Sequence, residues 1–148
     1  VWLPQLKEGG GDLYGGVYGG TSFYWELEET NPSAKRYVQL HQKKYNAPPG
    51  DYGAYAWSGV MEIARGCTLA KSFDSEAVAD TLRKNPAYDH YKGKQWWRTC
   101  DNKSFQDMWI VKGREPGKVK GEWGFVDLVA KIPANEELDR SCKEKGHA

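Results

Sequence analysis

The most regular hydrophobic pattern of the chain lies between Gly50 and Ser72. Apolar side chains recur there at spacings of three and four, at Trp57, Val60, Met61, Ala64 and Cys67. This period predicts a helix that packs these side chains against a core. The helix opens on a Gly- and Tyr-rich turn, Asp51 to Tyr55, which would present aromatic rings and free backbone N–H groups. Polar or anionic ligand groups bind well at such a helix N-terminus.

Two more helices are predicted on either side of this one. The first begins at Asn31, a capping residue, and Pro32, whose fixed φ suits the first helical position. Its apolar face comprises Ala34, Tyr37, Val38, His41 and Tyr45, and Pro48-Pro49 cannot continue it. The second is capped by Asp74, closes at Asn85-Pro86 and buries Ala77, Val78 and Leu82. His41 has no second ligand at helical spacing, which favours a structural histidine over a metal ligand.

The remaining segments alternate turn signals with strand patterns. Gly9-Gly10-Gly11 indicates a loop, and the aromatic run from Val17 to Trp25 indicates a strand. A loop is expected from Ala87 to Lys94. Strands are then predicted in GKQWWRTC from Gly93, in FQDMWIVKG with an irregularity at Asp107 and Met108, and in GEWGFVDLVAKI from Gly121 to Ile132. From Pro133 the polar tail should be a short helix or disordered.

Composition narrows the class of partner. The chain has 148 residues, which predicts one domain. A net charge of +1 and a charged fraction of 28% argue against nucleic-acid binding. No apolar run approaches the roughly 18 residues of a membrane span. The chain starts at Val1 rather than Met, so we expect a processed start or a piece of a longer protein.

Three cysteines bear on the compartment. Cys67 lies on the apolar side of the central helix and is predicted to be a small buried hydrophobe. Cys100 and Cys142 lie in polar surroundings without a C-x-x-C spacing. We predict a Cys100–Cys142 disulfide, which implies an oxidising compartment.

Nothing in the sequence predicts catalysis. His90 is next to Asp89, but adjacent residues of an extended chain point to opposite sides and would not form a dyad. Ser104 and Ser141 lack the elbow of a hydrolase nucleophile. No metal-ligand spacing or cofactor motif is present, so we expect no enzyme activity, no metal and no cofactor.

Taken together, the middle of the chain resembles the C-terminal portion of a type I periplasmic solute-binding protein, of the branched-chain amino acid (Leu/Ile/Val) binding family of ABC transporters. The residues that carry the resemblance are, in order, Gly15-Gly16-Val17-Tyr18, Asn31-Pro32-Ser33-Ala34, Lys44 to Pro49, Tyr55 to Val60, Asp74 to Leu82, Tyr91-Lys92-Gly93-Lys94 and Met108 to Lys112. Trp57 stands where the family more often has Tyr, and a Trp96-Trp97 pair follows the Gly93 step, which indicates a divergent branch.

The resemblance implies an α/β Venus-flytrap fold of two lobes that close over a solute, present here in part. It divides the chain into the end of lobe II and a crossing strand (1–30), lobe I helices (31–90), a return crossing with C-terminal strands (91–132) and a polar tail (133–148). The first units of lobe I and most of lobe II would lie upstream. A parallel sheet without its central strands would then leave open edges and uncovered apolar helix faces.

The resemblance also implies a function and a site. The function would be capture of a small polar organic molecule, such as an amino acid or amide, for an ABC permease, in the periplasm or tethered outside the cell. Tyr52 and Tyr55 would form a wall of the cleft beside the hinge, or else pack in the core or hinge. The upstream part of the same protein would supply the remaining ligand contacts.

An alternative is a free-standing aromatic-rich module. Trp96, Trp97, Trp109 and Trp123 would then bind carbohydrate or protein by stacking. The two hypotheses differ in whether these indoles line an open groove.

Overall fold

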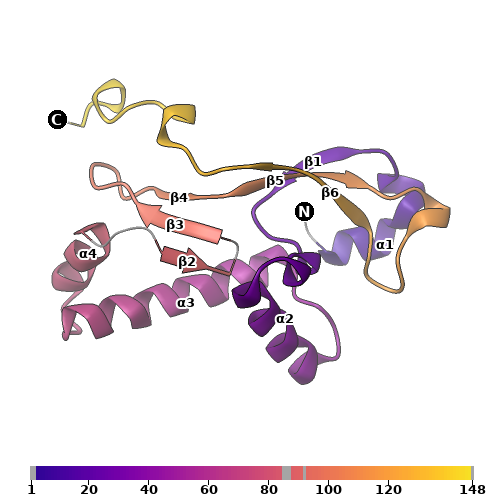
Figure 1. The fold of residues 1–148 in the computed structure, drawn as a ribbon, viewed down its shortest axis with the longest axis horizontal. Coiled ribbons are helices and arrows are strands. Elements are labelled where there is room, and N and C mark those ends of the chain that lie inside the picture. The colour runs from indigo at the N-terminus through magenta and orange to yellow at the C-terminus, as the bar shows by residue number, and fades with distance from the viewer. Residues whose placement is uncertain (1–2, 85–87, 92, 148) are drawn as a thin grey trace.

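The computed structural model describes residues 3–84, 88–91 and 93–147. Among these residues are the helices α1 (Leu3–Tyr14), α2 (Pro32–Tyr45), α3 (Asp51–Ala70) and α4 (Ser75–Lys84). Figure 1 shows α3 running along the long axis of the molecule beneath the strands, with α1 at one end and α4 near the other. The described part of the chain is elongated (Figure 1).

The strands of the described residues form two separate three-stranded sheets. One has the order β1 (Tyr18–Thr21), β5 (Met108–Gly113) and β6 (Val126–Ile132). The other has the order β2 (Tyr88–His90), β3 (Gly93–Trp97) and β4 (Ser104–Gln106). All the pairings in these sheets are antiparallel. The parallel sheet that the resemblance implied is therefore not found in the described part of the chain.

Several strand boundaries differ from the prediction. The strand expected from Val17 to Trp25 ends at Thr21, and a 3₁₀ helix occupies Trp25–Glu29. The expected loop 87–94 instead contains β2 and the first residues of β3. The strand predicted from Gly121 begins only at Val126, because a turn precedes it. The predicted helix end at Asn85-Pro86, with Ala87 and Lys92, lies outside the described residues.

Asp107 marks the point where one continuous segment changes sheets. β4 ends just before it in the second sheet, and β5 starts just after it in the first. Its buried carboxylate accepts the backbone N–H of Ala134 at 2.9 Å and pairs with Lys131. The irregularity predicted at Asp107 and Met108 is thus confirmed as this change of sheet.

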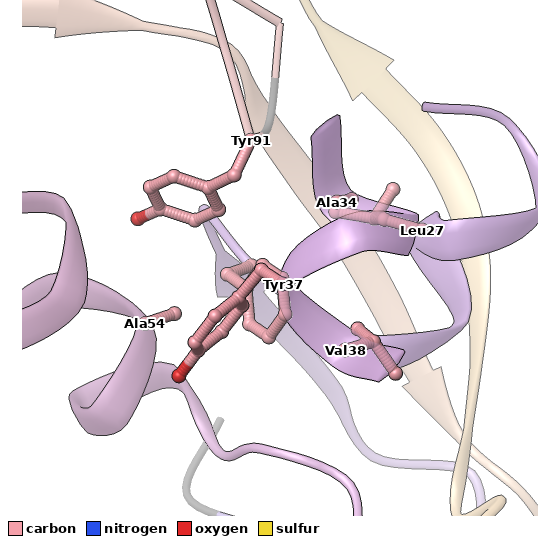
Figure 2. Packing of buried hydrophobic residues seen from close by; sticks show 7 residues of the cluster. Leu27, Ala34, Tyr37, Val38, Ala54 and Tyr91 are labelled. Atoms are coloured by element: carbon pink, nitrogen blue, oxygen red, sulfur yellow. The ribbon is translucent and has the colours of Figure 1, made fainter. Parts of the chain in front are cut away.

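The main hydrophobic core joins α2 and α3 to the segment that follows β1. Its buried members are Phe23, Leu27, Ala34, Tyr37, Val38, Ala54 and Tyr91, and Figure 2 shows the ring of Tyr91 above Ala54 and Tyr37. The rings of Phe23 and Tyr91 lie 5.4 Å apart, and those of Phe23 and Tyr37 lie 5.7 Å apart. Such edge and tilted contacts are favourable geometries for aromatic pairs.

Helix α2 agrees with the sequence prediction. Asn31 accepts the backbone N–H groups of Ser33 and Ala34, and Pro32 is the first helical residue. Ala34, Tyr37 and Val38 are buried. His41 is half-buried, and its Nδ1 lies 2.8 Å from the carbonyl oxygen of Ala47, a structural contact.

Helix α3 exists as predicted, and Trp57 of its predicted core face packs against the main core, but most of the rest of that face is not buried. Val60 is 67% exposed and Met61 is 45% exposed, while the buried residues are Asp51, Ala54, Glu62 and Gly66. Cys67, predicted to be buried, is only half-buried and lines an open apolar surface groove. Helix α3 thus turns Ala54, Trp57 and buried polar side chains towards the rest of the chain, while another apolar face is exposed.

Helix α4 is capped as predicted, but none of its residues is buried. The side chain of Asp74 accepts the backbone N–H of Ala77 at 2.9 Å. Ala77, Val78 and Leu82 are half-buried rather than inside a core. Val78 and Leu82 nevertheless face Gly66, where a Cβ would lie 2.7 Å from Val78 Cγ1. Gly66 therefore lets α4 pack close to α3.

Helix α1 replaces the loop that was predicted at Gly9-Gly10-Gly11. Its buried residues Leu3 and Leu6 join a second core cluster with Tyr24, Val111, Phe125 and Val126. Gly10 interrupts the helix with φ 57°, ψ −166°. A Cβ on Gly11 would lie 2.6 Å from backbone atoms of Pro116, so this glycine permits a close approach of the turn at Pro116. Gly11 thus serves packing, while the backbone of Gly10 leaves the helical conformation within the predicted loop.

The tail after β6 is held against the hairpin of β3 and β4. A disulfide joins Cys100 in the hairpin to Cys142 in the tail, as predicted. Asp139 of the tail accepts a hydrogen bond from Arg98 at 2.7 Å and pairs with Lys103 and Lys145. Arg98 and Lys145 also pair with Asp101. The tail contains short 3₁₀ helices at Glu136–Leu138 and Lys143–Lys145.

Candidate functional site

The N-terminal turns of α3 place the two predicted site residues beside the end of β1. Pro48-Pro49 ends the preceding loop, and Gly50 is the N-cap of α3. Tyr52 and Tyr55 follow at helical spacing, so both rings lie on one side of the helix. Their ring centroids are 6.2 Å apart at an interplanar angle of 81°.

The two tyrosines have different surroundings. Tyr52 is 66% exposed, so its ring is open to a ligand. Tyr55 is 39% exposed, and its hydroxyl is hydrogen-bonded to Ser22 Oγ at 3.0 Å. Ser22 is buried and directly follows β1. Tyr55 therefore ties α3 to this strand end.

The helix N-terminus is less open to anions than the sequence predicted. Asp51 is buried, and its carboxylate accepts the backbone N–H of Tyr52 at 3.0 Å. One of the N–H groups expected to be free is thereby occupied, and a negative charge already lies there. The exposed aromatic surface, rather than the helix dipole, is what this turn offers a ligand.

A polar and aromatic layer supports the turn from below. Ser58 Oγ lies 2.7 Å from His90 Nε2, and the rings of Trp57 and His90 stack at 6.0 Å with an angle of 12°. Tyr91 is fully buried under them. Burial, reinforced by the nearby Tyr55 hydroxyl, raises the pKa of Tyr91 above its usual value. Tyr91 therefore stays neutral and acts as a packing residue.

Sequence reasoning missed Ser22, Ser58 and Tyr91 as supports of this site. They are distant from one another in the chain, and no spacing rule links them. His90 was considered only with Asp89, whereas its observed partner is Ser58. Only the tertiary contact between β2 and α3 reveals this pair.

The tryptophans of the alternative hypothesis do not share one platform. Trp96 stacks on Phe105 with centroids 5.7 Å apart, while Trp97 Nε1 donates to Glu62 on α3 at 2.8 Å. Trp109 and Trp123 are half-buried and pack against the second core cluster. The four indoles thus serve different contacts.

Two further properties limit the chemistry of the described residues. They include no group of three or more His, Cys, Asp or Glu side chains placed to hold a metal ion. None of the helices in this part of the chain has the length and apolar character needed to cross a membrane.

The fold has counterparts in a known class, the type I periplasmic binding proteins. The sequence model of the periplasmic binding protein family matches residues 1–118. The chain therefore belongs to the periplasmic binding protein family. No curated protein matches it.

Solved structures show the same fold. A periplasmic binding protein from Burkholderia mallei is 24% identical, with a TM-score of 0.83 over 97% of this chain and 37% of its own. An amino acid ABC transporter substrate-binding protein from Pseudomonas fluorescens is 20% identical, with a TM-score of 0.83 over 99% of this chain and 38% of its own. The structure of an ABC-type branched-chain amino acid transporter from Rhodopseudomonas palustris is 28% identical, with a TM-score of 0.74 over 90% of this chain and 34% of its own. The chain thus spans little more than a third of each of these structures.

Proposed function

We propose that the chain is the C-terminal part of the solute-binding component of an ABC transporter. The complete protein captures a small polar organic molecule, such as an amino acid or amide, by closing its two lobes over it, and delivers it to a permease. It works in the periplasm, or tethered outside the cell. The family match and the two neighbours named as amino acid transport proteins support this proposal.

The observation that carries the proposal is the aromatic turn beside the end of β1. An exposed Tyr52 ring is available to a solute, while Tyr55 joins the same turn to Ser22. A ligand that contacts this turn would therefore interact with α3 directly and with the crossing strand through the Tyr55–Ser22 hydrogen bond. Hinge closure requires contacts that differ between the open and closed states, and a turn linked to a crossing strand can make them.

We also propose that the upstream part of the same protein covers the exposed face of α3. Val60, Ile63 and Cys67 line an open apolar groove with Phe73, whose side chain is almost entirely exposed. A soluble chain rarely leaves such a patch uncovered unless it is an interaction surface. The limited span against the solved neighbours supports the same view, because those chains contain further segments.

The Trp-based module is less well supported. Its requirement was an open groove lined by several indoles, whereas Trp96 and Trp97 lie side by side on β3 and have partners on different elements. Consecutive residues of a strand point to opposite faces. We do not extend that hypothesis.

The test is a thermal-shift screen of amino acids, amides, urea, aromatic acids and sugars on the complete protein. A true solute at a hundredfold excess over its Kd should stabilise the protein by about 2.7 kcal/mol. Tyr52→Ala should then weaken affinity roughly two- to tenfold, through loss of a stacking contact worth about 0.5–1.5 kcal/mol. Tyr52→Phe, which keeps the ring, is the matched control and should bind like the wild type.

Three results would count against the proposal. The first is a screen in which no small polar solute shifts the unfolding temperature. The second is a response to sugars alone, which would favour the carbohydrate module. The third is equal affinity in wild type and Tyr52→Ala, which would remove Tyr52 from the cleft wall.

A further inference from the structure

A second aromatic surface lies between α2 and α3; it shares Gly53 with the turn described above but includes neither Tyr52 nor Tyr55. It is a groove with a volume of about 390 Å³, lined by Tyr37, Leu40, His41, Lys44, Tyr45, Gly53 and Trp57. The rings of Tyr37 and Trp57 stack at 4.8 Å, and those of His41 and Tyr45 lie 4.6 Å apart. The groove thus has aromatic walls and contains no carboxylate among its lining residues.

One rim of this groove combines an exposed leucine with cations. Leu40 is 53% exposed although it lies on a helix with a buried face. Arg36, Lys43 and Lys44 are its neighbours at helical spacings of minus four, plus three and plus four. The three cations are exposed, and α2 contains no acidic residue. Leu40 is therefore a solvent-facing apolar side chain surrounded by positive charge.

Local structure accounts for only part of this arrangement. Lys43 and Lys44 lie in the last turn of α2, where positive charges interact favourably with the helix dipole. The aliphatic parts of lysine side chains can also cover apolar surface. Arg36 lies near the other end of the helix, where a cation gains nothing from the dipole. Leu40 and the exposed ring of Tyr45 together leave apolar area in water that a bound partner would cover.

We propose that this groove docks an acidic segment of a partner protein. The segment inserts an aliphatic or aromatic side chain beside Leu40 and the rings of Tyr45 and Trp57. Carboxylates that flank this side chain pair with Arg36, Lys43 and Lys44. This inference rests on the proposed function. The partner is then the permease, and the docked segment is one of its solvent-exposed loops.

The spacing of the charges favours a polypeptide over a small solute. Arg36 and Lys44 are eight residues apart in α2, which corresponds to about 12 Å along the helix axis. A single amino acid or aromatic acid cannot reach both ends of this row, whereas an extended peptide of about four residues can. Complementary charge also steers association and gives it a dependence on salt.

The experiment uses the complete protein with its permease reconstituted in lipid vesicles, and measures ATPase stimulation against the concentration of the solute-loaded binding protein. Lys44→Glu and Leu40→Ala should each raise the half-maximal concentration, Lys44→Glu by roughly tenfold. Lys35→Glu is the matched control, because it makes the same charge change nine residues away, on the opposite side of the helix. It should behave like the wild type. Added salt should raise the half-maximal concentration of the wild type more than that of Lys44→Glu, because salt screens the charge pairs that the variant has lost.

The solute-induced thermal shift of each variant separates the two proposals. A normal shift with impaired ATPase stimulation in Lys44→Glu and Leu40→Ala supports the docking groove. A normal shift with unimpaired stimulation in both overturns the groove and leaves the solute-binding function standing. Equal impairment by Lys35→Glu also overturns it, since the effect would not belong to the groove. Loss of the solute-induced thermal shift in Lys44→Glu would assign the groove to an anionic solute instead. If none of the tested solutes shifts the unfolding temperature of the wild type, the proposed function itself is overturned.

Discussion

At the scale of single residues, Tyr55 and Ser22 connect the aromatic turn of α3 to the end of β1. The hydroxyl groups of these residues form a 3.0 Å hydrogen bond between segments 33 positions apart in the chain. Ser22 is buried, so the loss of its partner would leave a polar atom with fewer hydrogen bonds in a dry environment. Tyr52, three positions earlier, is far more exposed.

This difference gives a prediction for paired Tyr→Phe substitutions. Tyr55→Phe should lower the free energy of unfolding by about 0.5–1.5 kcal/mol, the usual net value of one hydrogen bond. Tyr52→Phe changes an exposed position and should stay within about 0.5 kcal/mol of the wild type. Urea unfolding measures both. Equal effects of the two substitutions would show that the Ser22 bond contributes nothing to stability.

Residue-scale predictions from sequence succeeded where the relevant partner could be inferred from chemistry. The Cys100–Cys142 pair was found because both residues lie in polar surroundings and a third cysteine does not. The Ser58–His90 contact was missed, since a serine on a helix and a histidine in a short strand leave no shared pattern. Assignments of Tyr52 and Tyr55 to a cleft wall remain predictions.

At the scale of elements, helix ends were more predictable than helix faces. Asn31 and Pro32 carry their own local start signal, and α2 begins where they indicate. The apolar period of α3 predicted the helix correctly, but of its predicted core face Trp57 packs against the main core while Val60 and Met61 are exposed. Periodicity reveals which side is apolar, but the segment that covers that side need not belong to the same 148 residues.

The glycines of α1 led to the prediction of a loop where the structure has a helix interrupted at Gly10. Three successive glycines lower helix propensity and favoured a loop. Contacts of Leu3 and Leu6 in the second core cluster, with the close approach of Gly11 to Pro116, outweigh this local cost. Propensity is a weak guide where tertiary packing depends on the absence of a side chain.

The clamp that holds the tail to the β3–β4 hairpin should depend on pH. Hydrogen bonds from Arg98 and then Lys145 hold the pKa of Asp101 below its usual value, and those from Lys145 and then Lys103 do the same for Asp139. A carboxylate whose pKa is lowered by folding adds stability above its unfolded pKa of about 3.9, and this stability is lost as the pH falls further. We expect the unfolding free energy to decrease below about pH 4.

Asp139→Asn tests this clamp. The variant should be less stable than wild type at pH 7, and the difference should shrink as the pH falls from about 4 towards 2, because the wild-type carboxylate becomes neutral as well. Glu137→Gln removes an exposed carboxylate of the same tail and is the control. Urea unfolding at a series of pH values gives the comparison. A constant difference between Asp139→Asn and wild type at every pH would contradict the role of the charge.

At the scale of the whole molecule, the resemblance predicted the fold better than the residue patterns did. The patterns correctly indicated a mixture of helices and strands, yet they could not divide the strands between two antiparallel sheets. That division depends on Asp107 and its contacts with Ala134 and Lys131, which are distant in sequence. The expectation of an uncovered apolar helix face followed from the missing neighbours of the fold, and α3 has such a face.

If the upstream part of the protein packs on α3, it covers this apolar face. Ile63 is 62% exposed in this chain and lies in the apolar groove of α3. In the 148-residue chain alone, Ile63→Glu should change the unfolding free energy by no more than about 0.5 kcal/mol, as surface substitutions do. In the complete protein the same glutamate would be buried without a partner and should cost about 3–5 kcal/mol, or else prevent folding. Leu138→Glu, at an exposed tail position, should have little effect in both. A small effect of Ile63→Glu in the complete protein would mean that the upstream segment does not pack here, and the apolar face of α3 would then need a partner from another chain.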